Sequence, residues 1–137
     1  MTEKVVYVQG TWDLFHVGHL NIIRRTHGIG KNLIVGVNTD ESVRKYKGHL
    51  PIIRYADRAM MVGACRYVWM VIKSDLTINA EVLKDYYVDV CVLGTDWKDK
   101  ELEGVQKAME AGIEIRYFPR TDGISSTEIK ERIRGVV

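Results

Sequence analysis

Several apolar segments of this chain have no polar face. Residues 33–37 read Leu-Ile-Val-Gly-Val, and residues 90–93 read Val-Cys-Val-Leu. A strand with one face in water would alternate apolar and polar side chains, so these runs indicate strands that are covered on both faces. Helices usually provide that cover, and the pattern therefore predicts an α/β fold built on a parallel sheet.

Strand-like and helix-like segments alternate along the whole chain. The expected strands are residues 5–9, 33–38, 67–72, 88–93 and 113–118, and the expected helices are residues 18–27, 54–65, 79–86, 98–111 and 126–134. This alternation predicts a Rossmann-like, doubly wound parallel five-stranded sheet in a single domain over residues 1–137. Ligands of such sheets bind at the carboxyl ends of the strands, so functional residues are expected in the segments that follow them.

Charge and cysteine content narrow the classes of function. The 20 Lys and Arg residues nearly balance the 18 Asp and Glu residues, and a net charge of +2 excludes the strongly cationic surface of a general nucleic-acid binder. No apolar run reaches the roughly 20 residues of a membrane span, and the N-terminus does not have the pattern of a signal peptide. Cys65 and Cys91 lie in apolar segments without disulfide or metal spacing, so we expect buried, reduced thiols and a cytoplasmic protein.

The segment after the first expected strand has the features of an anion site. Gly10 permits a sharp turn, and the next helix begins near Gly18, where unsatisfied N–H groups and the helix dipole favour negative charge. His16 and His19 are three residues apart and share one helix face, so both imidazoles can point at the same anion. A zinc site would need a third ligand, and none follows at an obvious spacing. A chance pair of surface histidines is the other alternative.

Three motifs in this order resemble a known family. Gly-Thr-Trp-Asp at residues 10–13, followed by His-Val-Gly-His at residues 16–19, resembles the signature of the cytidylyltransferase branch of the nucleotidyltransferase superfamily. Gly-Thr-Asp-Trp at residues 94–97 and Arg-Thr-Asp-Gly-Ile-Ser-Ser-Thr at residues 120–127 are similar to motifs of glycerol-3-phosphate cytidylyltransferases. The resemblance extends from about residue 5 to residue 133.

The resemblance implies transfer of CMP from CTP to a small phosphorylated alcohol, with glycerol 3-phosphate as the best single candidate and pyrophosphate as the second product. It implies catalytic roles for His16, His19, Lys45 and Arg120, and substrate contacts from Lys45, Arg58, Arg66 and Trp97. The nucleotide would be bound by Gly10, Thr11, Trp12, Asp13, Gly18, Lys47, Gly94, Asp96, Arg120, Thr121, Gly123, Ile124, Ser125, Ser126 and Thr127. Mg²⁺ is expected as a cofactor that enters with the triphosphate, without a metal site made by the protein alone.

Several of these roles have alternatives. Residues 38–48 have the composition of a solvated basic loop, and the resemblance does not decide which of Lys45 and Lys47 contacts the acceptor and which the nucleotide. Asp13 is equally suited to capping a helix, and the hydroxyls of residues 125–127 are suited to the same task. Arg58 and Arg66 are either cations of the site or partners in structural ion pairs.

The acceptor and the nucleotide also have alternatives. Residues 76–80 contain no lysine, although glycerol-3-phosphate enzymes carry a substrate-side lysine there. Ethanolamine-phosphate or choline-phosphate cytidylyl transfer is one alternative, and adenylyl transfer to a sugar phosphate or a flavin precursor is another. A nucleotide-sensing module without turnover is the non-enzymatic alternative.

Trp69 and Met70 stand where relatives carry an acidic pair. This apolar pair, together with the usual assembly of the family, predicts a homodimer.

Overall fold

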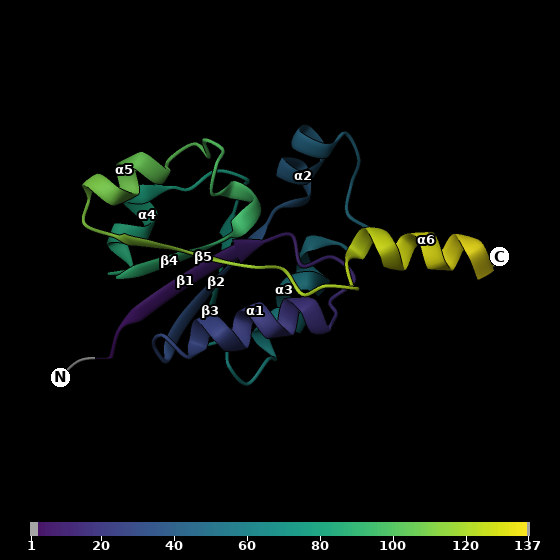
Figure 1. The fold of residues 1–137 in the computed structure, drawn as a ribbon, viewed down its shortest axis with the longest axis horizontal. Coiled ribbons are helices and arrows are strands. Elements are labelled where there is room, and N and C mark those ends of the chain that lie inside the picture. Colours follow the sequence, from purple (N-terminus) through teal and green to yellow (C-terminus); the bar gives the residue numbers. More distant parts are fainter. Residues whose placement is uncertain (1–2, 137) are drawn as a thin grey trace.

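Five parallel strands form one sheet in the computed structural model, which describes residues 3–136. The strands are β1 (Val5–Gly10), β2 (Asn32–Asn38), β3 (Met70–Ser74), β4 (Val90–Gly94) and β5 (Glu114–Phe118). Their order across the sheet is β3-β2-β1-β4-β5, so the chain first builds outward from β1 on one side and then crosses to β4 on the other (Figure 1). The strand order reverses between β1 and β4, and a ligand site is expected at the carboxyl end of this pair.

Helices cover both faces of the sheet, as the apolar strands predict. They are α1 (Val17–His27), α2 (Asp40–Lys47), α3 (Tyr55–Gly63), α4 (Ala80–Asp85), α5 (Val105–Glu110) and α6 (Ser126–Val136). On one face, Ile23 of α1 and Val62 of α3 pack against Val8 and its neighbours in the sheet. On the other, Leu83 of α4 and Ala108 of α5 belong to the cluster around Tyr7, so successive residues of β1 point into opposite cores. The predicted doubly wound α/β fold is confirmed.

Three elements differ from the sequence-based expectation. Residues 40–47, expected as a loop, form α2, because the Thr39 side chain caps the helix by accepting from the Ser42 N–H at 3.2 Å and two acidic residues follow in the first turn. Strand β3 begins at Met70 and not at residue 67. Helix α5 begins only at Val105, because Gly104 has φ +93° and any side chain there would collide with the Ile78 carbonyl.

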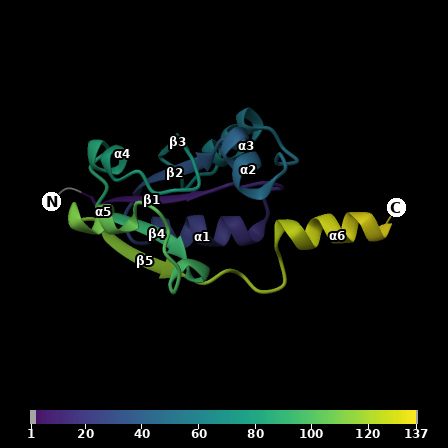
Figure 2. The same ribbon diagram turned by 90° about the horizontal axis from the view of Figure 1, so that it is seen from above.

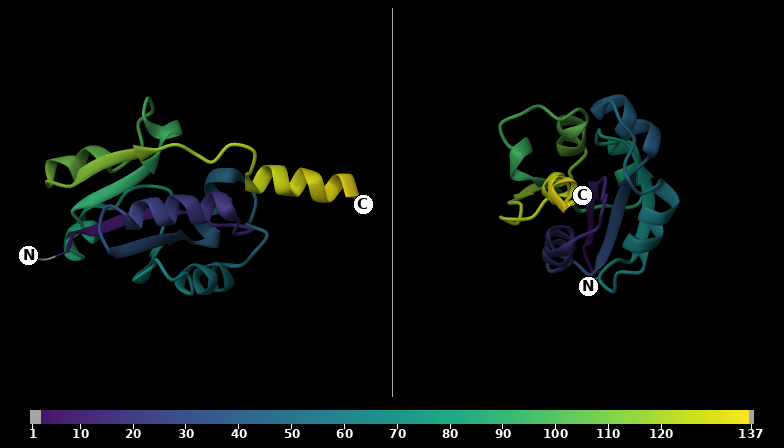
Figure 3. Two further views of the ribbon diagram at one scale, coloured as in Figure 1. Left: turned by 60° about the horizontal axis from the view of Figure 1, so that its bottom comes forward. Right: turned by 90° about the vertical axis from the view of Figure 1, so that its right-hand side faces the viewer.

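The carboxyl edge of the sheet brings distant segments together. Figure 2 shows α2 and α3 side by side near this edge, and Figure 3 shows α6 extending beyond it, away from the N-terminus. No residue of α6 is buried, and the first turn is tied to the body by the Ser126 hydroxyl, which donates to the Asp13 carbonyl at 2.7 Å. Among residues 3–136, no helix has the length and apolar character that a membrane crossing requires.

Candidate active site

A cavity of about 620 Å³ opens at the carboxyl edge of the sheet. Its walls come from the ends of β1 and β4, from the segments that follow all five strands, and from the first two turns of α6. The residues of the three sequence motifs that line it are Gly10, Thr11, Trp12, Asp13, His16, Gly18, His19, Gly94, Asp96, Trp97, Arg120, Thr121, Ile124, Ser125, Ser126 and Thr127. The fold therefore brings the three motifs, which are separated by up to about a hundred residues, into one concave site.

The two histidines form the amino end of α1 and are held by its backbone. His16 is the N-cap residue, and its Nδ1 accepts from the Gly18 N–H at 3.1 Å, while Nδ1 of His19 accepts from the His16 N–H at 3.2 Å. Both neutral rings therefore carry their proton on Nε2. The rings stack with their centroids 3.8 Å apart. A side chain at Gly18 would come 2.9 Å from Cε1 of His16, so glycine is required for this approach.

The environment keeps these imidazoles uncharged. Burial lowers the pKa of His19 to about 3, with a further contribution from the neighbouring His16. Burial also lowers the pKa of His16 below its ordinary value. At neutral pH the pair therefore offers two N–H donors without positive charge, at the positive end of the α1 dipole.

Cations from four other segments supply the positive charge. The cavity is lined by Lys47 of α2, Lys100 after β4, Arg120 after β5 and Lys130 of α6. The pKa of Lys47 is lowered by burial and then by the charges of Lys130 and Arg120, which means that these three cations act on one another. The two acidic residues of the lining do not neutralise them fully: Asp96 pairs with Arg120 at 3.0 Å, and the Lys130 ammonium lies 3.9 Å from Asp13. An anion is therefore favoured here.

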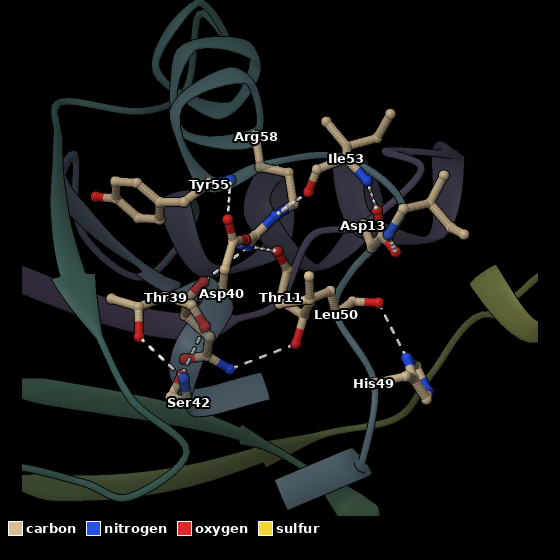
Figure 4. A network of polar contacts seen from close by, with 12 residues as sticks. Thr11, Asp13, Thr39, Asp40, Ser42, His49, Leu50, Ile53, Tyr55 and Arg58 are labelled. Carbon is tan, nitrogen blue, oxygen red and sulfur yellow. Dashed lines mark hydrogen bonds and ion pairs between the residues drawn. The ribbon is translucent and has the colours of Figure 1, made fainter. Parts of the chain in front are cut away.

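Asp13 and Trp12 use their side chains to hold the protein together. The Asp13 side chain is 5% exposed, and its two oxygens accept from the Ile52 N–H at 2.8 Å and the Ile53 N–H at 2.9 Å (Figure 4). The Trp12 indole N–H donates to the Gly36 carbonyl at 2.9 Å. For Asp13, the geometry favours orientation of the turn over binding of the ribose.

The hydroxyl groups of the third motif have three different partners. Ser125 Oγ accepts from the Glu128 N–H at 3.0 Å and so caps α6, as one of the sequence alternatives proposed. Thr121 Oγ1 accepts from the Asn21 side chain at 3.0 Å, which fastens the motif to α1. The Ser126 hydroxyl donates to the Asp13 carbonyl, and Thr127 lines the cavity beside it.

Four of the expected site residues lie outside the cavity lining. Lys45 is exposed on α2, because residues two positions apart on a helix point in nearly opposite directions and Lys47 faces the cavity. Arg58 is 1% exposed and bonded within the protein, which corrects its assignment as a substrate contact. Arg66 lies before β3, at the amino edge of the sheet, with its guanidinium over the Tyr67 ring. Gly123, at φ +80°, forms the turn before Ile124.

Several lining residues were not anticipated from the sequence. Lys130 follows Ser126 by four residues, so one helical turn places it on the same face of α6, and this spacing was a usable signal. His49 and Tyr46 reach the cavity from the end of α2, and Lys100 reaches it from the segment after the short helix η1 (Thr95–Trp97). None of these three residues belongs to one of the three motifs, so the sequence did not mark them as cavity residues. Within residues 3–136, no cluster of three or more potential metal ligands occurs.

The chain belongs to the cytidylyltransferase-like family, whose model matches residues 7–132. It is 36% identical over 135 residues to the bifunctional protein HldE of Vibrio vulnificus (strain YJ016), covering 97% of this chain and 28% of that protein. It is also 36% identical over 135 residues to an ethanolamine-phosphate cytidylyltransferase of Dictyostelium discoideum, covering 93% of this chain and 36% of that protein. The chain thus spans only about a third of the length of these relatives.

Solved structures share the fold. A lipopolysaccharide core biosynthesis protein from Thermoplasma volcanium superimposes with a TM-score of 0.73 at 21% identity, covering 88% of this chain and all of that one. A putative nicotinate-nucleotide adenylyltransferase from Vibrio parahaemolyticus superimposes with a TM-score of 0.61 at 16% identity, covering 98% of this chain and 89% of that one. Together with the family match, these neighbours place the chain among Rossmann-like nucleotidyltransferase folds.

Proposed function

We propose that this protein transfers CMP from CTP to the phosphate of a small phosphorylated alcohol and releases pyrophosphate. The observation that carries the proposal is the convergence of two neutral Nε2–H donors, His16 and His19, with Lys47, Arg120 and Lys130 around one cavity. Such a site suits a polyanion that must be positioned and stabilised, and it contains no activated nucleophile. Membership of the cytidylyltransferase-like family supports this class of reaction.

The reaction needs little covalent chemistry from the protein. An oxygen of the acceptor phosphate attacks the α-phosphorus of CTP, the bond from that phosphorus to the bridging oxygen breaks, and pyrophosphate leaves with the electron pair. Negative charge grows on the oxygens around the α-phosphorus and on the leaving group. His16 and His19 donate to the first set of oxygens, while Lys47, Arg120 and Lys130 balance the charge of the phosphate chain.

Glycerol 3-phosphate is the acceptor that we place first. Both oxygens of Asp13 accept from backbone N–H groups, and Asp96 pairs with Arg120, so the lining offers the ammonium group of a competing acceptor no carboxylate without a protein partner. A polyol phosphate needs no such partner. Phosphoethanolamine is the second candidate, because relatives named as ethanolamine-phosphate cytidylyltransferases match most of this chain.

Mg²⁺ would enter this site with the triphosphate. Both oxygens of Asp13 are occupied by backbone N–H groups, and Asp96 is the one other carboxylate of the lining, so the cavity does not fit a cage of protein carboxylates and phosphate oxygens and water would hold the ion. It would supply further charge neutralisation on the phosphate chain. The free thiols of Cys65 and Cys91 agree with the reducing cytoplasm that we propose as its location.

A homodimer is part of the same proposal. A groove of about 510 Å³ between α3 and the edge strand β3 is lined mostly by apolar residues, and Met60 and Trp69 are 72% and 57% exposed in and beside it. Among the described residues, β3 pairs only with β2, so the backbone groups of its other edge are available to a second copy of the chain. Light scattering at micromolar concentration should give twice the chain mass, and Trp69→Glu should reduce it; a monomeric wild type would contradict this part.

The activity is tested by product formation. The protein is incubated with CTP or ATP, Mg²⁺ and a pool of glycerol 3-phosphate, phosphoethanolamine, phosphocholine and a hexose 1-phosphate. Pyrophosphate release is followed and the products are identified by mass spectrometry. We expect CDP-glycerol with CTP, and no product from a His16→Ala/His19→Ala control. A preference for ATP would overturn the choice of nucleotide, and binding of CTP without any product would indicate a sensor.

A further inference from the structure

Arg58 is a buried cation whose contacts all lie within the protein. Its Nη1 donates to the Thr11 carbonyl at 2.6 Å and to the Asn38 carbonyl at 2.8 Å, and its Nε donates to the Ile53 carbonyl at 2.8 Å (Figure 4). Its Nη2 pairs with Asp40 at 2.6 Å. One guanidinium on α3 therefore joins the ends of the neighbouring strands β1 and β2 to the segment that leads into α3.

Fold stability alone is a weak reason to keep such a group. Removing an arginine from water carries a large desolvation cost, and well-packed apolar side chains often replace buried ion pairs without loss of stability. Arg58 uses four of its five N–H donors, and three of the acceptors are backbone carbonyls that follow β1, end β2 and precede α3. The planar fork of arginine can hold several carbonyls at fixed angles, which neither lysine nor an apolar residue can do.

The carbonyl of Thr11 opens a segment with unusual backbone angles. Trp12 has φ +58° and Leu14 has φ +52°, in the left-handed region that bulky side chains rarely adopt. Such residues are strained and persist only where the surroundings hold them. The contacts that hold it include those of Arg58 on Thr11, the Trp12 indole on Gly36 and the Asp13 carboxylate on residues 52 and 53, besides the Ser126 hydroxyl on the Asp13 carbonyl.

We propose that Arg58 is a positioning residue for nucleotidyl transfer, which acts by holding the Thr11 carbonyl and with it the strained segment that leads to His16 and His19. The peptide after Thr11 is trans, so fixing the carbonyl on Arg58 directs the Trp12 N–H the opposite way. Arg58 does not line the cavity, and its effect reaches the substrate only through this segment. The inference rests on the proposed function.

The test compares Arg58→Lys with a matched control, Val62→Ala. Val62 is a fully buried residue of the same helix that packs in the core and has no polar contact with the segment. Urea unfolding establishes that both variants are folded and weakened. The kcat and the KM for CTP are measured by pyrophosphate release, and the amide signals of Thr11 and Trp12 are followed by ¹H–¹⁵N NMR.

Arg58→Lys should lose about 10- to 100-fold in kcat, because misplacement of catalytic groups by about 1 Å has effects of this size, whereas its KM for CTP should change little. Val62→Ala should keep its kcat. The Thr11 signal should shift in Arg58→Lys alone, whereas the Trp12 signal should shift more in Arg58→Lys than in Val62→Ala, because Val62 belongs to the same core cluster as Trp12. If Arg58→Lys does not fold, Asp40→Asn weakens the anchoring of Arg58 and should lower kcat in the same direction by a smaller factor.

The outcomes separate the two proposals. Equal kcat in Arg58→Lys and Val62→Ala, a loss confined to KM, or unchanged amide signals would overturn the positioning role. If the wild type transfers no nucleotide to any acceptor, the proposed function fails. In that case the amide signals still decide whether Arg58 holds the segment.

Discussion

Asp13→Asn tests whether a buried carboxylate holds residues 52 and 53 against the active-site loop. The two carboxylate oxygens each accept one backbone N–H, at 2.8 and 2.9 Å, and the side chain is almost completely buried. An asparagine keeps one acceptor and turns an NH₂ group toward the other N–H. A hydrogen bond to a charged group contributes about 1.5–3 kcal/mol to stability, and a buried donor left without an acceptor costs a similar amount. The two values describe partly the same loss, so they are not added. We expect a loss of about 2–3 kcal/mol.

Asp75→Asn is the matched control. The Asp75 carboxylate also accepts from a backbone N–H, that of Thr77 at 2.8 Å, but this contact is exposed to solvent. Its replacement should cost less than about 0.5 kcal/mol. Both variants are compared with the wild type by urea unfolding at pH 7, with the slope on denaturant fitted separately. A loss below 1 kcal/mol for Asp13→Asn, or one equal to that of Asp75→Asn, would refute the reasoning.

Three further results are expected. His16→Ala or His19→Ala should reduce kcat by on the order of 10²–10⁴ in a folded protein, and near-normal turnover in both would show that the chemistry lies elsewhere. Lys47→Met should raise the KM for CTP about 10- to 100-fold whereas Lys45→Met should not, because only Lys47 lines the cavity; equal effects in steady-state assays would contradict this assignment. The pKa of His19 is about 3 in the folded protein and near 6.5 in the unfolded chain, so between these values only the unfolded chain takes up the proton. The free energy of unfolding should therefore fall as pH drops from about 6.5 toward 3, by at most about 1.4 kcal/mol per pH unit. Urea unfolding of His19→Gln should lack this part of the pH dependence, and identical pH profiles for the two proteins would refute the expectation.

Local patterns carried most of the fold and part of the site. Apolar runs without a polar face determine where covered strands form, as in β2 and β4, because side-chain burial there depends on little beyond the run itself. The histidine pair is equally local: His16 caps the helix in which His19 stands, so the contacts span three residues. Helix α2 also had local signals, because Thr39 and the two acidic residues after it are typical of a helix start. The basic composition of the segment, which favoured a loop, does not distinguish a loop from an exposed helix.

Contacts across the sheet edge decided the rest. The sequence places Lys45 and Lys47 on one basic segment, and only the packing of α2 turns Lys47 toward the cavity. Nothing in the sequence distinguishes Arg58 from an arginine at the surface. The order of the strands brings the carbonyls of Thr11 and Asn38 to it, from 47 and 20 residues away. Every residue has a backbone carbonyl, so the residue type does not show which carbonyl accepts a hydrogen bond. A side chain whose partners are carbonyls far away in the sequence is therefore recognised only in the folded chain. The residue types and their local order predicted an anion site at this edge of the sheet, and the tertiary structure determined which cations line the cavity and which arginine contacts the backbone beside it.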